Sequence, residues 1–205
     1  MFVTLEGIDR SGKTTQAAML ARALGPETVL LREPGGTEVG ERVRSLLKDG
    51  AIELGPRGEL MLFCAARAEL CARVIRPALD AGRDVVCDRF VDSSIAYQGA
   101  ARGLGVEVVE EVCELATAGL RPHLTLLLRI DPRRAESRGQ ARLHAGEADG
   151  SDRFEAEGVA LQRAVAGGYD QIAARDSERV TVIEADALAA QVHAAVMEAV
   201  RSRCS

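Results

Sequence analysis

The sequence predicts an α/β protein in which a doubly wound, parallel sheet of five strands is flanked by helices, with one short lid. Short runs rich in leucine and β-branched residues alternate with longer stretches of helical periodicity. Several of these runs are apolar almost throughout, which is typical of parallel strands that helices cover on both faces. Strands that alternate with helices imply right-handed βαβ units. The length of 205 residues, 47% of them hydrophobic, suits a single domain with one substantial core.

The elements follow one another without an internal repeat or a linker-like segment. We expect strands at residues 2–6, 28–31, 84–88, 124–130 and 180–184, where the short apolar runs lie. We expect helices near residues 13–24, 38–48, 57–82, 106–118, 154–175 and 187–200. The last helix has Leu188, Val192, Val196 and Val200 on one face, behind Asp186 as its N-cap. Residues 139–151 have no apolar face and predict the surface loop or lid.

Composition argues against several classes of protein. The formal net charge of −5 gives no electrostatic reason to expect nucleic acid or a membrane surface as a partner. No apolar run approaches the roughly 18 residues of a membrane span, and the N-terminus lacks the basic start of a signal peptide. The five cysteines form no C-x-x-C pair and are odd in number, so neither a disulfide framework nor a zinc site is expected. We therefore expect a reduced, cytoplasmic protein.

The loop after the first strand carries the clearest motif. It matches G-x-x-x-x-G-K-[ST] between a strand and a helical pattern, with the residues Gly7, Ile8, Asp9, Arg10, Ser11, Gly12, Lys13 and Thr14. Glycines let the backbone wrap around phosphate, and successive N–H groups and the start of the helix attract negative charge. The ammonium group of Lys13 suits the β- and γ-phosphates of ATP, and the hydroxyl of Thr14 suits Mg²⁺. The sequence therefore predicts a P-loop.

The alternative is a glycine-rich turn that binds nothing. Lysine is scarce in this chain, because Lys13 and Lys48 are the only lysines among 26 basic residues. A rare lysine inside a motif with the required context favours a phosphate ligand. A P-loop does not by itself choose between kinases, GTPases and motors. The chain has no N-K-x-D motif for guanine, and one short domain leaves little room for a motor, so phosphoryl transfer to a small molecule remains.

Residues that follow the second and third predicted strands point to an acceptor site. Arg32, Asp88 and Arg89 come directly after these strands, and the carboxyl ends of parallel strands face the ligand crevice. Arg89 is placed to hold an acceptor phosphate, and Asp88 is expected near the metal and its waters. Phe63 and Arg67 are one helical turn apart, so a ring and a guanidinium can address one planar base. The alternatives are a surface ion pair at Asp88 and Arg89, and a core position for Phe63.

Over nearly its whole length the chain resembles the bacterial thymidylate kinase family, whose members phosphorylate dTMP to dTDP with ATP. The resemblance is carried by FVTLEGIDRSGKTTQ, LLREPGGT, LMLFCAARAEL, VVCDRFVDSSIAYQGAARGLG, LTLLLRIDP, SDRFEAE and GYDQIA. Their order and spacing are specific, since REPGGT and DRF-x-DSS-x-AYQG are hard to place in another nucleotide kinase. The resemblance implies the cofactors ATP and Mg²⁺, the substrate dTMP, and a homodimer packed through helices.

The resemblance also implies how the base of dTMP is bound. Phe63 stacks on thymine, and Arg67 hydrogen-bonds its carbonyl edge. Ser94 and Gln98 line the base and the sugar. Tyr97 covers the 2′ face of the ribose and thereby favours a deoxy sugar.

Four further residues are expected around the sugar and the acceptor phosphate. The resemblance places Asp9 near the sugar 3′ hydroxyl or the acceptor phosphate, and Arg89 on that phosphate. Arg32 and Pro34 form the opposite wall of the site.

Several positions depart from the pattern common in the family. Ala66, Glu69 and Leu70 stand where Asp, Gln and His are frequent, so contacts on the base side are expected to differ in detail. Arg129 and His123 stand where acidic residues are usual, so local ion pairs are expected to differ as well.

Thymidylate kinases supply a catalytic arginine from the P-loop or from the lid, and this chain has candidates in both places. Arg10 lies in the loop, and Arg138, Arg142 and Arg153 flank or enter the predicted lid. The loop directs Arg10 toward the γ-phosphate or the bridging oxygen, where charge stabilises the transition state. We therefore expect Arg10 to be the principal catalytic arginine and Arg142 to assist it. The alternative for the lid arginines is a set of solvated surface charges.

The predicted function is ATP-dependent phosphorylation of dTMP to dTDP, a step of dTTP biosynthesis, by in-line phosphoryl transfer. Lys13, Mg²⁺ and the arginines, Arg89 among them, neutralise the transferring charge. One rival is another nucleotide or deoxynucleoside kinase on the same fold. The other is a regulator that hydrolyses ATP slowly and phosphorylates nothing.

Overall fold

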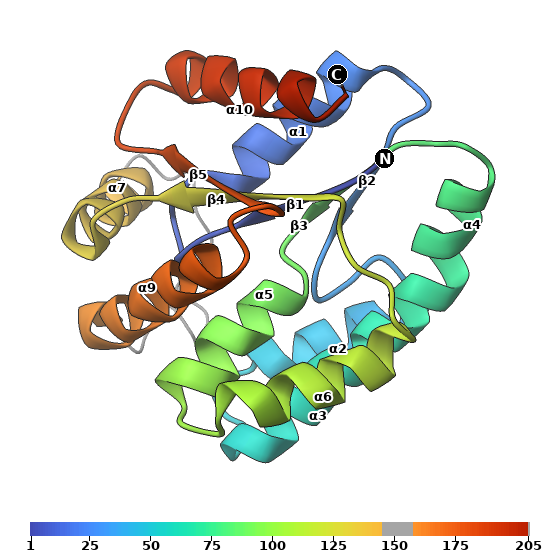
Figure 1. The fold of residues 1–205 in the computed structure, drawn as a ribbon. Helices are drawn as coiled ribbons and strands as arrows, with labels where there is room; N and C mark the ends of the chain where they lie inside the picture. The colour runs from blue at the N-terminus through green and yellow to red at the C-terminus, as the bar shows by residue number, and fades with distance from the viewer. Residues whose placement is uncertain (145–157, 205) are drawn as a thin grey trace.

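The computed structural model describes residues 1–144 and 158–204 and has the predicted architecture, a parallel five-stranded sheet between layers of helices (Figure 1). The strand order is β2-β3-β1-β4-β5. The strands are β1 (Phe2–Glu6), β2 (Val29–Arg32), β3 (Val85–Asp88), β4 (Leu124–Arg129) and β5 (Val180–Glu184). Each lies within a residue of its predicted position.

β1 is the central strand and is buried along its whole length. It pairs in parallel with β3 and β4, with Phe2 opposite Val85 and Val3 opposite Leu124. Its apolar sequence follows from this position, because helices cover both faces of the strand. Since β1, β2 and β3 run in parallel, the loops that follow them meet at one edge of the sheet.

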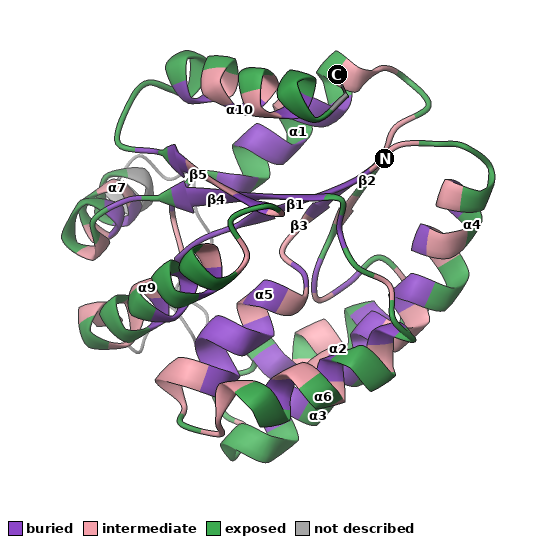
Figure 2. Ribbon diagram, in the orientation of Figure 1, coloured by how far each residue is buried: buried purple, intermediate pink, exposed green. Residues whose placement is uncertain are grey.

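Helices lie on both sides of the sheet. They are α1 (Lys13–Leu24), α2 (Glu38–Lys48), α3 (Pro56–Leu70), α4 (Arg76–Asp80), α5 (Val91–Ser94), α6 (Val106–Thr117), α7 (Pro132–His144), α9 (Gly158–Arg175) and α10 (Ala189–Cys204), with the π-helical segments η1 (Cys71–Ile75) and η2 (Ile95–Ala101). α1 and α10 cover one face, and α5, α9 and the group of α2, α3 and α6 lie on the other side (Figure 1). Figure 2 shows the buried residues concentrated in the sheet and on the inner sides of the helices.

One helical segment is missing from the prediction. Residues 91–101 form α5 and η2, although no regular apolar period marks them. The segment is buried on several sides, including polar residues such as Asp92, Ser94 and Gln98. A helix that is buried around its circumference does not show the one-sided pattern of an amphipathic helix. The prediction for 57–82 is confirmed, since α3, η1 and α4 follow one another without a break.

The prediction of a loop over residues 139–151 is wrong for its first part, and the assignment of these residues to a lid stays a prediction. Residues 139–144 belong to α7, which packs against α9 and buries Ala135. Its alanines and arginines are good helix formers, so intrinsic propensity outweighs the missing apolar face. The remainder of the predicted lid, residues 145–151, lies outside the described residues.

The prediction that Asp186 is the N-cap of the last helix is wrong. α10 begins at Ala189. The carboxylate of Asp186 instead forms ion pairs with Arg134 at 3.1 Å and Arg138 at 3.3 Å, and thereby ties the loop before α10 to α7. Three of the four residues on the predicted apolar face are buried, namely Val192, Val196 and Val200, whereas Leu188 is 73% exposed.

The two unusual residues near β4 have local partners. The backbone N–H of Phe2 donates to Nδ1 of His123 at 2.9 Å. Arg129 forms an ion pair with Glu184 at 2.6 Å, so the cation at the end of β4 meets an anion at the end of β5.

Four cysteines, Cys64, Cys71, Cys87 and Cys113, are buried free thiols. Among residues 1–144 and 158–204, no helix combines the length and the apolar character that crossing a membrane requires.

Candidate active site

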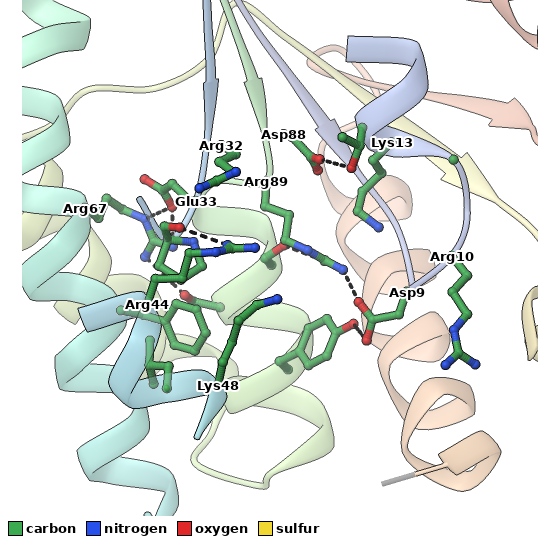
Figure 3. Close-up of a pocket in the computed structure, with 18 of the residues that line it drawn as sticks. Asp9, Arg10, Lys13, Arg32, Glu33, Arg44, Lys48, Arg67, Asp88 and Arg89 are labelled. Carbon is green, nitrogen blue, oxygen red and sulfur yellow. Dashed lines mark hydrogen bonds and ion pairs between the residues drawn. The ribbon is translucent and has the colours of Figure 1, made fainter. Parts of the chain in front are cut away.

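A cavity of about 790 Å³ opens where the loops after β1, β2 and β3 meet (Figure 3). The predicted site residues that line it are Asp9, Arg10, Gly12, Lys13, Thr14, Arg32, Pro34, Phe63, Arg67, Asp88, Arg89, Ser94, Tyr97 and Gln98. The cavity is also lined by Thr15, Glu33, Arg44, Leu47, Lys48, Ser93, Arg138 and Ala141. The fold therefore brings the phosphate-binding loop and the predicted acceptor residues into one cavity.

The other three P-loop residues shape the loop from behind. Gly7 has a φ of 137°, and a Cβ at this position would lie 2.5 Å from the carbonyl oxygen of Leu128, so only glycine fits. Ile8 and Ser11 are buried. The ammonium group of Lys13 donates to the carbonyl oxygen of Ile8 at 2.7 Å and to Oγ of Ser11 at 3.4 Å. The loop thus holds its own lysine in place at the cavity wall.

Lys13 is buried, and its pKa is lowered to about 8. Burial is the largest cause, and the charge of Arg89 adds to it, whereas the carboxylates of Asp88 and Asp9 act in the opposite direction. A weakly hydrated ammonium group gains more from a phosphate partner than one in water does, because little solvent has to be displaced.

The side chains of Thr14 and Asp88 are in contact at the carboxyl edge of the sheet. The hydroxyl of Thr14 donates to Oδ2 of Asp88 at 2.6 Å, and Oδ1 of Asp88 is buried without a partner within the described part of the chain. A hydroxyl and a carboxylate with an unused oxygen suit Mg²⁺, which takes oxygen ligands and usually keeps waters and substrate phosphates in its shell. No group of three or more His, Cys, Asp or Glu side chains forms an all-protein metal cage among the described residues.

Arg89 connects the two halves of the cavity. Its guanidinium forms an ion pair with Asp9 of the P-loop and donates to the carbonyl oxygen of Gly7 and to Oγ of Ser93, both at 3.1 Å. It also lies over the ring of Tyr97, with 5.3 Å between Cζ and the ring centroid. The backbone of Arg89 has a φ of 72°, a left-handed conformation that costs energy in a residue other than glycine. Strain of this kind persists where surrounding contacts fix the residue, as they do here.

Asp9 is the partner of Arg89 in the P-loop. Its Oδ2 accepts hydrogen bonds from Nε2 of Gln162 at 2.7 Å and from the hydroxyl of Tyr97 at 3.1 Å. Burial alone would raise the pKa of Asp9, but the charges of Arg89 and Lys13 and these two hydrogen bonds outweigh it, so the pKa lies below its usual value. Asp9 is therefore an ionised anchor rather than a proton acceptor near neutral pH.

Behind Arg89 lies Glu6, a residue that the sequence analysis did not select. It accepts hydrogen bonds from the backbone N–H of Phe90 at 2.7 Å, from Oγ of Ser93 at 2.6 Å and from the hydroxyl of Tyr169 at 2.8 Å. Ser93 in turn contacts Arg89. Glu6 thus fixes the loop that carries Arg89. Its position as the last residue of a buried strand, directly before the P-loop, was a signal that the sequence offered.

Arg67, the arginine expected to bind the base, is held by hydrogen bonds to several protein groups. Arg67 is 1% exposed and donates through Nε to Oε2 of Glu33 at 2.8 Å. Its Nη1 contacts Ser94 at 3.1 Å and Sγ of Cys113 at 3.4 Å, and its Nη2 donates to the carbonyl oxygen of Phe90 at 3.1 Å. A carbonyl group of a ligand would have to replace one of the weaker contacts on Nη1.

Glu33 is the anion that balances Arg67, and it lies between two predicted site residues, Arg32 and Pro34. Sequence analysis missed its role because the partner is distant in the chain. Phe63 is partly exposed, one helical turn before Arg67, and lines the same cavity.

Arg10 lies on the other side of the P-loop from Arg67. Its backbone has a φ of 62°. Figure 3 shows its guanidinium pointing away from the ammonium group of Lys13. It packs on α7 at Gly139, where a Cβ would come within 2.3 Å of Cδ of Arg10. Arg138, the neighbour of Gly139, lines the cavity, whereas the side chain of Arg142 and all of Arg153 lie outside the described residues.

Three cationic residues complete the wall formed by β2 and α2. Arg32 forms an ion pair with Glu41 at 3.1 Å, and Arg44 donates to the carbonyl oxygen of Pro34 at 3.0 Å. Lys48, the second lysine of the chain, lies at the end of α2 and points into the cavity (Figure 3). The surplus of cationic side chains favours ligands with several phosphates.

The fold and the site together define a P-loop kinase with a small phosphorylated acceptor. A sequence model of the thymidylate kinase family matches residues 5–196. The thymidylate kinase of Deinococcus radiodurans is 43% identical over 209 residues, which cover 97% of this chain and 97% of the relative. The thymidylate kinase of Rhizorhabdus wittichii is 46% identical over 202 residues, with coverage of 97% and 95%.

A solved structure gives the same result. The crystal structure of thymidylate kinase from Ehrlichia chaffeensis superposes with a TM-score of 0.78 at 33% identity, and the match covers 98% of each chain. The chain belongs to the thymidylate kinase family and is an enzyme, a dTMP kinase.

Glu6 makes the stability of the fold depend on pH. Burial and the nearby charge of Asp92 raise the pKa of Glu6 to about 7. Its protonated form is therefore favoured in the folded state, so its contribution to stability is present below the unfolded pKa and is lost as the pH rises through about 7. Between pH 5 and pH 8, we expect this loss to be on the order of 2 kcal/mol in the free energy of unfolding.

Urea denaturation of the wild type and of Glu6→Gln at both pH values measures this loss. The variant should lose less stability than the wild type as the pH rises, whereas Glu53→Gln, at an exposed position, should follow the wild type. Equal pH dependence in the wild type and in Glu6→Gln would show that Glu6 does not titrate in this range.

Proposed function

We propose that this dTMP kinase transfers the γ-phosphoryl group of Mg·ATP to the phosphate of dTMP inside the cavity that joins the P-loop to the acceptor residues. The observation that carries the proposal is the contact between Asp9 of the P-loop and Arg89 after β3. Through it, the residues suited to the donor and those suited to the acceptor phosphate are neighbours, as an in-line transfer requires.

On the donor side, the backbone N–H groups of the P-loop and the ammonium group of Lys13 hold the phosphates of ATP. Thr14 and Asp88 would hold Mg²⁺, which the unpartnered Oδ1 of Asp88 supports. When bound, Mg²⁺ would supply positive charge for the phosphate oxygens. Lys13 keeps its charge at the same oxygens, because Asp88 and Asp9 oppose the effect of burial on its pKa.

On the acceptor side, Arg89 holds the phosphate of dTMP, and Asp9 holds Arg89 and lies near the sugar 3′ hydroxyl. Phe63 stacks on thymine, and Arg67 faces its 4-carbonyl group. The remaining contacts with the base, the sugar and the opposite wall of the site are assigned to Ser94, Tyr97, Gln98, Arg32 and Pro34. Support comes from the cavity, which all of these residues line.

The chemical step depends on placement and charge rather than on covalent participation of the protein. Arg10 is the principal catalytic arginine, and Arg142 assists it. The packing of Arg10 against Gly139 of α7 supports a coupling between the P-loop and the segment that begins with α7, because a movement of this helix would also move the guanidinium. In the proposed transition state, Arg10 contacts the γ-phosphate or the bridging oxygen.

The proposal includes a homodimer and a cytoplasmic location. Apolar side chains are exposed on the neighbouring helices α3 and α6, with exposed fractions of 54% for Met61, 54% for Val108 and 84% for Leu115. Exposed apolar side chains on two adjacent helices support a contact between protein chains, and light scattering measures the oligomeric state directly. The four buried free thiols support a reducing compartment.

Lys13→Ala tests the donor side of the proposal. We expect kcat for dTMP phosphorylation to fall by about 10²-fold or more, because charge at the transferring phosphoryl group is lost. An acceptor panel of dTMP, dUMP, thymidine, dCMP and AMP, measured with the wild type, defines the activity that is lost. Arg57→Ala removes a cation from an exposed position on α3 and is the control. Near-normal kcat in folded Lys13→Ala, or a preference of the wild type for thymidine over dTMP, would contradict the proposal.

Arg10 and Gly139 are tested together. We expect Arg10→Gly to lower kcat by about 10²-fold with little change in dTMP binding, and Arg142→Ala to have a smaller effect. Gly139→Ala should also lower kcat, since its methyl group displaces the guanidinium of Arg10, and it should have little further effect when Arg10 is already glycine. If Arg142→Ala abolishes turnover while Arg10→Gly is nearly silent, the assignment of the two arginines is reversed.

A further inference from the structure

α3 carries three residues at four-residue spacing, of which the second and third line the cavity and the first has no role so far. These are Glu59, Phe63 and Arg67, which lie one helical turn apart along one side of the helix. Glu59 is 1% exposed, and η2 packs against this helix. A carboxylate with so little contact with water needs fixed hydrogen-bond donors around it.

The donors come from η2 and from the residue that follows it. Nε2 of Gln98 donates to Oε1 of Glu59 at 2.7 Å. Arg102 donates to both carboxylate oxygens, from Nε to Oε1 at 3.2 Å and from Nη2 to Oε2 at 3.2 Å. The charge of Glu59 is thus balanced by Arg102, and one of its hydrogen bonds is left for the amide of Gln98.

The carboxylate determines which way the amide of Gln98 points. An ionised carboxylate only accepts hydrogen bonds, whereas a carboxamide carries an acceptor at one end and a donor at the other. The NH₂ group of Gln98 must therefore face Glu59, and its carbonyl oxygen must lie on the other side. This oxygen, Oε1, is buried and has no hydrogen-bond partner in the segments that the structure describes.

A buried acceptor without a partner is costly, at about 1–3 kcal/mol, and calls for a physical reason. Gln98 is 1% exposed and lines the cavity together with Phe63 and Arg67. A ligand with an N–H group on the facing edge would satisfy the oxygen. Thymine has this group at N3, whereas cytosine has a lone pair there.

We propose that Glu59 is a positioning residue that fixes the carbonyl group of Gln98 toward the base, so that the enzyme selects bases with an N3–H group. The inference rests on the proposed placement of thymine between Phe63, Arg67 and Gln98. Arg67 offers only donors and matches the 4-carbonyl group, while the locked amide offers an acceptor and matches N3–H. A base with a lone pair at N3 leaves the buried oxygen of Gln98 unpaired, whereas Arg67 keeps its protein partners. An unpaired buried group is what makes discrimination strong.

The experiment compares two acceptors that differ at N3 but keep an oxygen at position 4. These are dTMP, with N3–H, and O4-methyl-dTMP, with a lone pair at N3. The measured quantity is the ratio of kcat/KM for the two acceptors in the intact enzyme, with KM for ATP and the thermal midpoint as further readouts. Glu59→Ala should lower this ratio about tenfold, the equivalent of one hydrogen bond, mainly through a higher KM for dTMP. KM for ATP should not change.

A charge exchange makes the test more specific. In the double variant Glu59→Lys with Arg102→Glu, the ion pair is kept, but residue 59 becomes a donor. The amide of Gln98 should then turn its carbonyl group toward the lysine and its NH₂ group toward the base. The ratio should fall below that of Glu59→Ala, in favour of O4-methyl-dTMP. If the double variant does not fold, the ratio measured for Glu59→Ala decides whether the proposal stands.

Two controls separate the possible explanations. Val109→Ala creates a cavity in the core beside η2 without touching the amide, so it should lower stability and leave the ratio unchanged. Gln98→Ala should lower the ratio as Glu59→Ala does. If Gln98→Ala leaves the ratio at the wild-type value, the proposed placement of the base is wrong. If Gln98→Ala lowers the ratio and folded Glu59→Ala does not, the base placement stands and the role of Glu59 is overturned.

Discussion

The ion pair between Asp9 and Arg89 is the contact on which the arrangement of the site depends. It joins the loop after β1 to the loop after β3, two neighbouring parallel strands whose carboxyl ends meet at one edge of the sheet. The position of Arg89 requires a left-handed backbone conformation with a φ of 72°, which costs conformational energy in a residue other than glycine. Glu6, Ser93 and Tyr169 hold this conformation from behind. A cation in a strained loop is thereby placed within reach of both phosphate-binding halves of one cavity.

Carboxylates also orient other polar groups of the site. Glu33 holds Arg67, Glu59 holds Gln98, and Asp88 accepts from Thr14. Because a carboxylate accepts but does not donate, each of these contacts fixes both the position and the hydrogen-bonding direction of its partner. Glu33, Asp88 and Gln98 each keep a buried oxygen without a hydrogen-bond partner within the described residues. The oxygens of Asp88 and Gln98 leave capacity for a cation at the proposed metal site and for a hydrogen-bond donor at the proposed base site.

Sequence analysis is most successful where a contact is local in the chain. The P-loop, the strand ends and the pair Phe63 and Arg67 can be read from spacing, since one loop or one helical turn determines their geometry. Sequence analysis did not predict the roles of Glu6, Glu33 and Glu59. Their hydrogen-bond partners lie between 34 and 163 residues away in the chain, and no sequence spacing indicates such pairs. The helical segment of residues 91–101 was not predicted, because burial on several sides removes the one-sided apolar pattern that marks a surface helix. The prediction of a loop was wrong at 139–144 because helix propensity determines the conformation there without an apolar face.

A double-mutant cycle on Asp9 and Arg89 tests this account most directly. Binding of dTMP and of ATP would be measured by calorimetry for Asp9→Asn, Arg89→Lys and the double variant. The account predicts that each single change weakens dTMP binding and that the double variant is little worse than either, with a coupling energy of about 1–3 kcal/mol. Strictly additive losses would show that the two side chains act independently and would contradict the central role of this ion pair.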